Sequence, residues 1–305
     1  MILIIGSGKI SLKFQKFLLH QNLNFDEYSF ENFSKLDLQT FEIEKYSSVF
    51  YLGYNHNSLF FNITIFYKFI KYLIKKNYKG KFIFFNTQVI INNNISKKKS
   101  TWYENDFLNR YYLCKKLQSN ILLNTELNYF NLYLPFVFNI SSVQENILEE
   151  IGNTKIVSLP NSGKNYFYFL DSEVLIEILL RIHKNELFDK NKNLFLYSDY
   201  IKLIDFLKKN KNFNIKKIID NNYLNQYNLS NFSYLRFILL NLIKNIIMLF
   251  NFRISKKTSY KNNKKINQRT DYLTLPPLIN KILWFDYFKL EKFKNITFID
   301  TNKDI

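Results

Sequence analysis

The N-terminal stretch MILIIGSGKIS, residues 1–11, decides the fold. Five apolar residues lead into the turn Gly6-Ser7-Gly8, and apolar residues recur at helical spacing over residues 12–19. This order predicts a buried strand, a tight turn and a helix. Glycines at such a turn let a pyrophosphate approach the backbone, and the helix N-terminus faces its negative charge. A plain strand-to-helix turn without a ligand is the alternative reading.

The same alternation continues along the chain. Short apolar runs at 48–52, 82–85 and 129–134 have the length and composition of strands that are buried on both faces of a parallel sheet. Helical patterns lie at residues 59–76, 111–123 and 172–183. We therefore predict an α/β fold: a Rossmann-type, doubly wound parallel sheet with a smaller C-terminal substrate-binding region.

The pattern loosens after residue 184. A weak strand at 193–197 and a helix at 200–209 lie among linkers rich in Asn and Lys. We expect a nucleotide-binding domain over residues 1–185, with 140–165 contributing to the substrate region. Residues 186–305 would form the C-terminal substrate or accessory region.

A long apolar run, FSYLRFILLNLIKNIIMLFNF, occupies residues 232–252 and is followed by a basic stretch at 253–265. Arg236 and Lys244 interrupt the run, which disfavours a helix that spans the bilayer. An amphipathic helix docked on the core fits this pattern. So does a helix in the membrane interface with lysines near anionic headgroups, which leaves peripheral membrane contact through 232–265 open.

The formal net charge of +18 raises the question of a nucleic-acid partner, because clustered Lys and Arg bind phosphates. The sequence has no alanine, few Gly and Pro, and far more Lys than Arg, which is what an AT-rich coding sequence produces. No nucleic-acid-binding motif accompanies the charge, so we expect no nucleic-acid partner. A basic surface still favours substrates that carry phosphate.

The single cysteine, Cys114, excludes an internal disulfide, and no His/Cys cluster suggests a metal site. The N-terminus lacks both the basic region and the small-residue cleavage site of a signal peptide. We therefore expect a cytoplasmic protein, with the inner face of the membrane as a peripheral alternative.

A tandem of tyrosines and lysines occurs in NRYYLCKKLQ, residues 109–118. It follows Thr87, a hydroxyl residue at the end of a predicted buried strand. Tyr111 and Lys115 would lie one helical turn apart. The lysine ammonium is expected to lower the pKa of the phenol, while Thr87 hydrogen-bonds the reacting oxygen. Thr87, Tyr111 and Lys115 are therefore the predicted catalytic residues.

The second register, Tyr112 with Lys116, is the alternative. The residues two and six positions after the lysine should face the core, and in the first register these are the apolar Leu117 and Ile121. The second register would bury Gln118 instead. We therefore favour the first register.

Over residues 1 to about 200 the chain resembles the extended short-chain dehydrogenase/reductase family, which comprises nucleotide-sugar epimerases, dehydratases and reductases. The glycine turn, two strand ends, a later strand with its loop, and the segment where the substrate domain rejoins the core occur in the family's order. These segments are residues 6–11, 49–54, 85–90, 132–138 and 165–171. The short stretch 34–38 resembles the compact arrangement of dTDP-4-dehydrorhamnose reductase-like members.

The resemblance implies NAD or NADP as cofactor and a nucleotide-activated sugar as substrate, in the synthesis of surface polysaccharide or glycan precursors. A homodimer is left open. The implied cofactor-binding residues are Gly6, Ser7, Gly8, Lys9, Ile10, Ser29, Leu52, Gly53, Tyr54, Lys115 and Pro135. Ser29 stands near the position of the acid that holds the ribose hydroxyls, so the choice between NAD and NADP stays open.

The chain also departs from the family's pattern. Ser11 replaces the third glycine, while Asn86 and Tyr133 stand where the family often has Ser and Arg. Asp26 and Glu27 fall in what should be a buried strand. These departures favour an alternative function: a non-catalytic, dinucleotide-binding scaffold or sensor, associated with the membrane through residues 232–265.

Overall fold

The computed structural model describes residues 1–55, 59–88, 90, 110–140, 156–159, 163–164, 166–188, 192–209, 215, 217–220, 272–274 and 296–304. The expected apolar helix at 232–252 and the basic stretch at 253–265 lie outside these ranges. Membrane contact through them stays a prediction.

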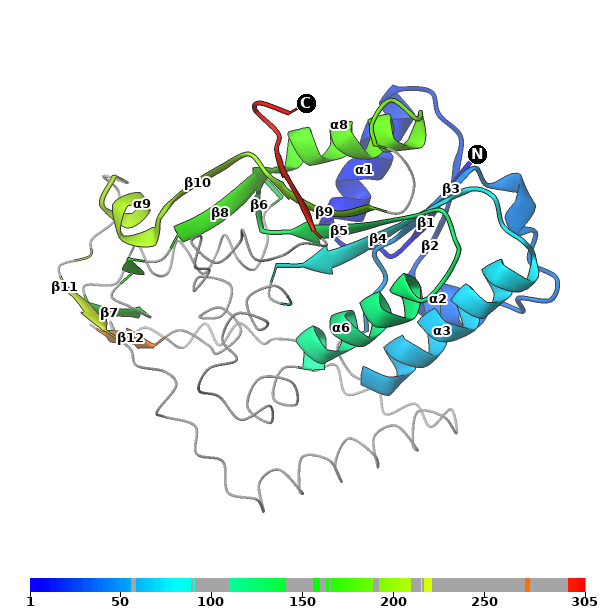
Figure 1. Cartoon of the computed structure of the whole chain (residues 1–305), viewed down its shortest axis with the longest axis horizontal. Coiled ribbons are helices and arrows are strands. Elements are labelled where there is room, and N and C mark those ends of the chain that lie inside the picture. The colour runs from blue at the N-terminus through cyan, green and yellow to red at the C-terminus, as the bar shows by residue number, and fades with distance from the viewer. Residues whose placement is uncertain are drawn as a thin grey trace, which may run out of the picture.

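Seven parallel strands form the central sheet, in the order β13-β9-β5-β4-β3-β1-β2 (Figure 1). In chain order they are β1 (Ile2–Ile5), β2 (Phe25–Tyr28), β3 (Ser48–Tyr51), β4 (Lys81–Thr87), β5 (Tyr129–Leu134), β9 (Lys192–Tyr197) and β13 (Thr297–Asp300). Every residue of β1, β3, β4 and β5 is buried, as expected of strands that are covered on both faces. The predicted Rossmann-type, doubly wound sheet is confirmed.

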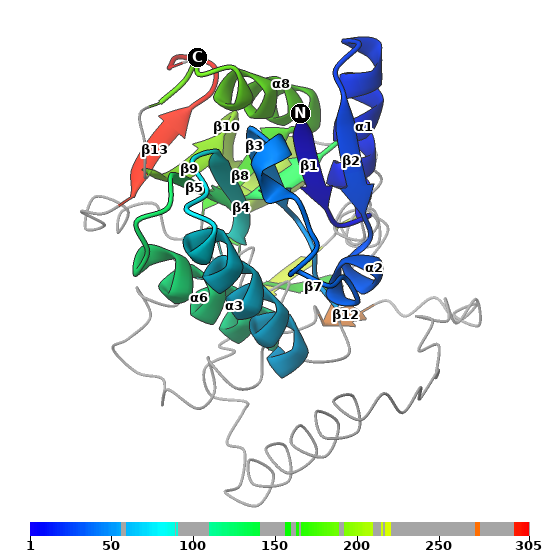
Figure 2. The same ribbon diagram turned by 90° about the vertical axis from the view of Figure 1, so that its right-hand side faces the viewer.

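Helices cover both faces of this sheet (Figure 2). Helices α1 (Lys9–His20) and α8 (Ser172–His183) pack on one face, and α2 (Phe30–Ser34), α3 (Leu59–Lys75) and α6 (Arg110–Leu123) pack on the other. The second face also carries a short 3₁₀ helix, η1 (Ile43–Lys45). None of the helices in the described segments is both long and apolar enough to cross a membrane.

The two faces bury separate apolar cores. The core under α1 and α8 is largely aliphatic, with a close ring contact of 4.8 Å between Phe14 and Phe50. The core under α3 is aromatic, and the Tyr51 ring lies 5.1 Å from the Phe66 ring. The abundant Phe and Tyr of the sequence therefore stabilise the fold by burying large side chains.

Two smaller sheets accompany the central one. The first joins β10 (Asp199–Lys202), β8 (Tyr166–Asp171) and β6 (Phe136–Phe138), and the second joins β11 (Lys217–Asp220), β7 (Ile156–Leu159) and β12 (Tyr272–Thr274). The helix predicted at 200–209 is wrong for its first three residues, because these pair in antiparallel fashion with β8. Helix α9 (Leu203–Lys209) begins only afterwards.

Strands β9 and β13 lie in the central sheet although both come from beyond residue 185. The central sheet therefore does not end at residue 185. The predicted division into a nucleotide-binding domain and a C-terminal substrate region stays a prediction. The predicted strand at 193–197 is confirmed as β9.

Strand β2 ends the central sheet, and in the described part of the chain no strand pairs with its outer side. The edge position explains how a carboxylate fits in this strand, because Asp26 is only partly buried there. The Tyr46 hydroxyl donates to Asp26 Oδ2 at 2.5 Å and Lys45 Nζ lies 3.1 Å from the same oxygen. Both contacts, the hydroxyl first, hold the pKa of Asp26 below its usual value.

Candidate active site

The predicted site residues gather at one edge of the central sheet. Gly6 follows β1, Ser29 follows β2, Gly53 follows β3, Thr87 ends β4 and Pro135 follows β5. The carboxyl ends of parallel strands share an edge, and ligands of open α/β sheets bind in the crevice outside it. The fold therefore brings residues from the ends of five strands together at the carboxyl edge of the sheet.

Position 6 requires a glycine, because of its backbone conformation and because of the atoms that surround it. Its φ of +124° is a value that residues with a side chain rarely adopt. A Cβ at this position would lie 2.9 Å from both the nitrogen of Gly53 and the carbonyl carbon of Leu52. Gly53 is equally confined, because its own Cβ would lie 2.5 Å from the Phe30 ring. The two glycines thus allow the turn after β1 to touch the loop after β3.

Gly8 has a different environment, which fits an anion. It is the N-cap of α1, no side chain caps the helix there, and a Cβ on Gly8 would meet no atom within 4 Å. Ser7 and Lys9 are exposed and Ile10 is partly exposed. An open turn before a helix without a capping side chain is the arrangement that receives a pyrophosphate.

Ser11 stands in place of the third glycine and has a structural partner. Its buried hydroxyl donates to the carbonyl oxygen of Gly6 at 2.6 Å and accepts a hydrogen bond from Gln15 Nε2 at 2.9 Å. The hydroxyl therefore ties the first turn of α1 to the glycine turn.

Ser29 serves as the N-cap of α2, where its hydroxyl accepts a hydrogen bond from the main-chain nitrogen of Asn32 at 3.2 Å. The structure thus gives this predicted cofactor-binding residue a local capping role at the end of β2.

Lys115 and Tyr111 lie on α6 beside the end of β4. Lys115 is only 2% exposed, and its Nζ donates to the carbonyl oxygen of Phe85 at 2.8 Å. The same Nζ lies 4.7 Å from the centre of the Phe84 ring and 5.9 Å from the centre of the Tyr111 ring. Tyr111 in turn meets Tyr54 edge to face, with ring centres 4.9 Å apart.

The expected effect of Lys115 on Tyr111 is wrong for the free protein. Burial raises the pKa of Tyr111, and the Cys114 thiol beside it acts in the same direction. The charge of Lys115 does not offset the loss of solvent around the phenol. Burial also lowers the pKa of Lys115 to about 8. Burial raises the pKa of Cys114 to about 12, so its sulfur stays a thiol.

The inner face of α6 differs from the prediction. Leu117 and Ile121 were expected against the core; Ile121 does pack against it while partly exposed, but Leu117 is 36% exposed. Gln118, Ser119 and Leu122 are buried instead. The reason is that α6 packs through polar side chains that bond to groups on α3 and the sheet.

Burial nevertheless separates the two registers. Lys115 points inward and lies one turn after Tyr111, whereas Lys116 is partly exposed. The side chain of Tyr112 lies outside the described part of the structure. The pairing of Tyr111 with Lys115 stays a prediction, and the burial of Lys115, not the apolar spacing, is the observation in its favour.

Asn62 is a residue that the sequence analysis missed. Its side chain accepts from the main-chain nitrogen of Asn55 and donates to the oxygen of the same residue, both at 2.7 Å. Gln118 Nε2 donates to the carbonyl oxygen of Asn62 at 3.3 Å. The loop that carries Tyr54 is thereby fixed to α3 and α6. The sequence signal that could have revealed this residue is a lone Asn in the apolar run LFFNITIF.

A second polar network supports Thr87. Asn86 Oδ1 accepts from the main-chain nitrogen of Thr87 at 2.9 Å, and Asn86 Nδ2 donates to Asn131 Oδ1 at 3.0 Å. Asn131 Nδ2 lies 3.0 Å from both the Tyr133 and the Ser119 hydroxyl oxygens. Asn86 and Tyr133, two departures from the family's pattern, are thus joined through one buried residue.

No protein-family model matches the sequence, and no curated protein does so either. Solved structures share the fold at low identity. One is a short-chain dehydrogenase/reductase superfamily protein from Agrobacterium tumefaciens with bound NAD, which has a TM-score of 0.52, 13% identity, and coverage of 82% of this chain and 98% of that one.

Two further structures have similar values. A GDP-mannoheptose C4 reductase from Campylobacter jejuni with NADP bound has a TM-score of 0.50 and 14% identity, and the match covers 79% of this chain and 98% of that one. A dTDP-4-dehydrorhamnose reductase from Clostridium acetobutylicum has a TM-score of 0.51 and 11% identity, with 78% and 98% covered. The predicted resemblance is confirmed for the fold.

Proposed function

We propose that this chain is an NAD(P)-dependent enzyme that acts on a nucleotide-activated sugar, by epimerisation, dehydration or reduction, in the synthesis of surface polysaccharide or glycan precursors. One observation carries the proposal: the buried Lys115 and the partly exposed Tyr111, whose ring meets that of Tyr54, lie at the same sheet edge as the close approach between Gly6 and Gly53. The substrates and cofactors named for the similar solved structures support it.

The turn after β1 would hold the dinucleotide. Main-chain nitrogens at the start of α1 would bind the pyrophosphate, with Gly8 leaving the space that it needs. Leu52, Gly53 and Tyr54 would line the cofactor on the β3 side, and Pro135 on the β5 side. A bound nicotinamide supplies or accepts the hydride in this chemistry.

Tyr111 would exchange a proton with the oxygen on the sugar carbon that is oxidised or reduced. The raised pKa of Tyr111 in the free protein keeps the phenol protonated, which suits a general acid in a reduction. Thr87 would hydrogen-bond the same oxygen and so position it against the phenol. Lys115 would stabilise the phenolate and hold the nicotinamide ribose, through the N–H groups of its ammonium that do not bind the Phe85 carbonyl.

Two experiments test the proposal in sequence. Binding of NADH and NADPH is measured first, by the change in nicotinamide fluorescence on adding the protein. A panel of nucleotide sugars is then incubated with protein and NAD or NADP, and turnover is followed by absorbance of the reduced nicotinamide and by chromatography of the products. Failure to bind either cofactor would overturn the proposal.

A second candidate is a dinucleotide-binding scaffold or sensor without turnover. The raised pKa of Tyr111 favours it, because the free protein does not activate this phenol. A scaffold would bind NAD(P) with the same affinity before and after Tyr111→Phe, and neither protein would turn over any sugar of the panel.

A further inference from the structure

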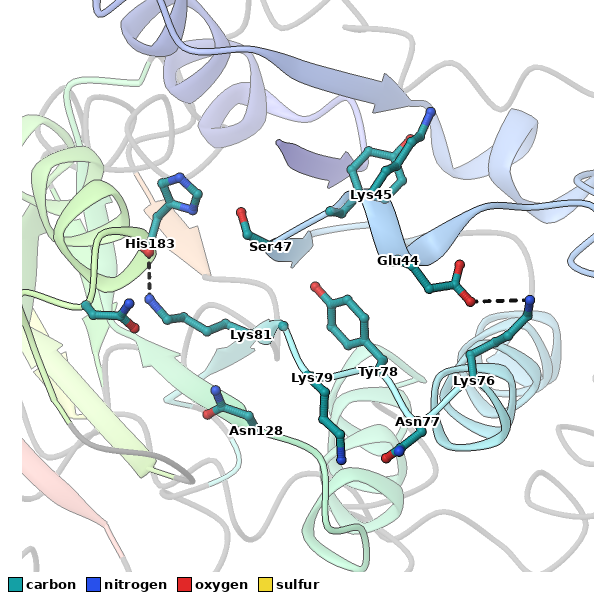
Figure 3. Close-up of a pocket in the computed structure, with 13 residues that line it drawn as sticks. Glu44, Lys45, Ser47, Lys76, Asn77, Tyr78, Lys79, Lys81, Asn128 and His183 are labelled. Atoms are coloured by element: carbon teal, nitrogen blue, oxygen red, sulfur yellow. Dashed lines mark hydrogen bonds and ion pairs between the residues drawn. The ribbon is translucent and has the colours of Figure 1, made fainter.

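A pocket of about 570 Å³ lies at the opposite edge of the central sheet, where the strands begin. It is formed by the segments that precede β3, β4 and β5 and by the end of α8 (Figure 3). None of the residues proposed for the cofactor or the reaction lines it. This pocket is therefore independent of the candidate active site.

Lys81 places a buried positive charge beside this pocket. The residue is 8% exposed, and its Nζ donates to the carbonyl oxygen of His183 at 2.6 Å and also to that of Ile182. In the described part of the chain Lys81 has no carboxylate partner. Burial accordingly lowers the pKa of Lys81. A buried ammonium without a counter-ion is costly, so a bound anion would stabilise it.

Tyr78 directs a polar group into the same region. The residue is 7% exposed, and its hydroxyl has no hydrogen-bond partner among the described residues. Figure 3 shows the hydroxyl pointing toward the space between Ser47 and Lys81. It lies against Gly80, where a Cβ would come within 2.2 Å of the hydroxyl oxygen. A buried hydroxyl without a partner costs free energy, which a ligand that accepts its hydrogen would restore.

Asn128 contributes a second polar atom. It lines the pocket, and its buried side-chain oxygen has no hydrogen-bond partner among the described residues. The pocket therefore offers a hydroxyl that can donate and a side-chain oxygen that can accept.

The electrostatic environment of the pocket is positive. Burial and then the positive charges of Lys81, the N-terminus and Lys184 lower the pKa of His183 to about 4. The one carboxylate that lines the pocket, Glu44, is held by Lys76 at 3.3 Å. Lys79 adds a further exposed ammonium. An anion that enters this space meets several cations and no free carboxylate from the lining residues.

We propose that this pocket binds a phosphate group, as inorganic phosphate or as part of a small phosphorylated molecule. The Lys81 ammonium and the Tyr78 hydroxyl donate to its oxygens, and a protonated phosphate oxygen donates to Asn128. Lys79, whose side chain points away from these groups in Figure 3, adds positive charge at the rim of the pocket. The volume exceeds that of phosphate alone and leaves room for an attached organic group.

His183 provides a local readout because it lines the pocket. Its ring signals are titrated by NMR in sodium chloride, and then at the same ionic strength in sodium phosphate or ribose 5-phosphate. Phosphate should raise the pKa of His183 by roughly half a unit or more, because a nearby anion favours the imidazolium. The exposed His20, outside the pocket, should not shift and serves as the internal reference. A response to inorganic phosphate alone would identify a free-ion site, and a response to both would identify a phosphorylated molecule.

Two variants complete the test. Tyr78→Phe removes only the hydroxyl and should weaken phosphate binding roughly tenfold while leaving the fold intact, since the hydroxyl bonds to nothing in the free protein. Lys79→Gln should weaken binding by a smaller factor, because it removes a positive charge at the rim, whereas Lys75→Gln, which removes an equal charge outside the pocket, should not weaken it. An unmoved His183 pKa, or equal phosphate affinity in Tyr78→Phe and the unaltered protein, would overturn the proposal.

Discussion

The Nζ atom of Lys115 donates a 2.8 Å hydrogen bond to the main-chain carbonyl oxygen of Phe85, two residues before the end of β4. The bond joins the middle of α6 to the sheet edge where the reaction is proposed to occur. Lys115 therefore has a structural partner in the free protein, and its ammonium keeps further N–H groups that a catalytic role can use.

The first prediction concerns pH. Burial lowers the pKa of Lys115 from 10.5 to about 8, so between these values the unfolded chain binds more protons than the folded one. The free energy of unfolding should therefore rise with pH through this window. Compared with Lys115→Met, the unaltered protein should gain on the order of 2–3 kcal/mol between pH 7 and pH 10.5. Urea denaturation of both proteins at each pH measures the difference, and a constant difference would contradict the pKa shift.

The second prediction concerns the reaction. Tyr111→Phe keeps the ring that packs against Tyr54 but removes the proton, so turnover should fall by about 10²-fold or more. Binding of NADH or NADPH, measured by fluorescence, should stay within about twofold of the unaltered protein. Tyr112→Phe is the matched control and should keep full turnover. The reverse result, loss only with Tyr112→Phe, would assign the reaction to the other register.

The third prediction separates the roles of two glycines. Gly6→Ala should destabilise the fold by about 2–4 kcal/mol, because the new Cβ meets the backbone of Gly53 at a φ that alanine rarely adopts. Gly8→Ala has open space around it and should change stability by less than about 1 kcal/mol. It should still weaken NAD(P) binding, because its methyl group would occupy space proposed for the pyrophosphate.

Thermal unfolding and cofactor titration of both glycine variants give the two readouts. Unchanged cofactor affinity in a folded Gly8→Ala protein would place the dinucleotide elsewhere.

The fourth prediction concerns the clamp on the Tyr54 loop. Asn62→Asp retains an acceptor for the Asn55 nitrogen but cannot donate to the Asn55 oxygen, and it buries a carboxylate. We expect a loss of about 2–4 kcal/mol in the free energy of unfolding. Asn120→Asp, on the exposed side of α6, is the control and should change stability by no more than about 0.5 kcal/mol. Equal unfolding midpoints for the two variants would show that the clamp contributes nothing.

The parts of the fold that local sequence could predict are those with local causes. Continuous apolar runs placed β3, β4 and β5, because strands covered on both faces need no polar residues. Two edge strands have no such continuous apolar run, and the sequence did not predict them as strands. Strand β10 was read as helix and β13 was not predicted, since both are short, partly exposed and defined by partners far away in the sequence.

The candidate site shows the same division. The glycine turn and the strand end at Thr87 follow from the residues themselves. The orientation of α6 does not, because its buried face includes Gln118 and Ser119, which a hydropathy pattern assigns to solvent. Their partners, Asn62 and Asn131, come from other elements. Hydrogen bonds between α6 and other elements determine which face of the helix is buried. A single sequence does not show these bonds.

Strand β13 has a consequence for synthesis of the protein. It pairs with β9, about a hundred residues earlier, so on the ribosome β9 emerges long before its neighbour exists. Until then the growing chain carries an open strand edge that includes the apolar Leu194 and Leu196. Such an edge is a template for aggregation, and β13, at the outer edge of the sheet in Figure 2, covers it once it has been synthesised.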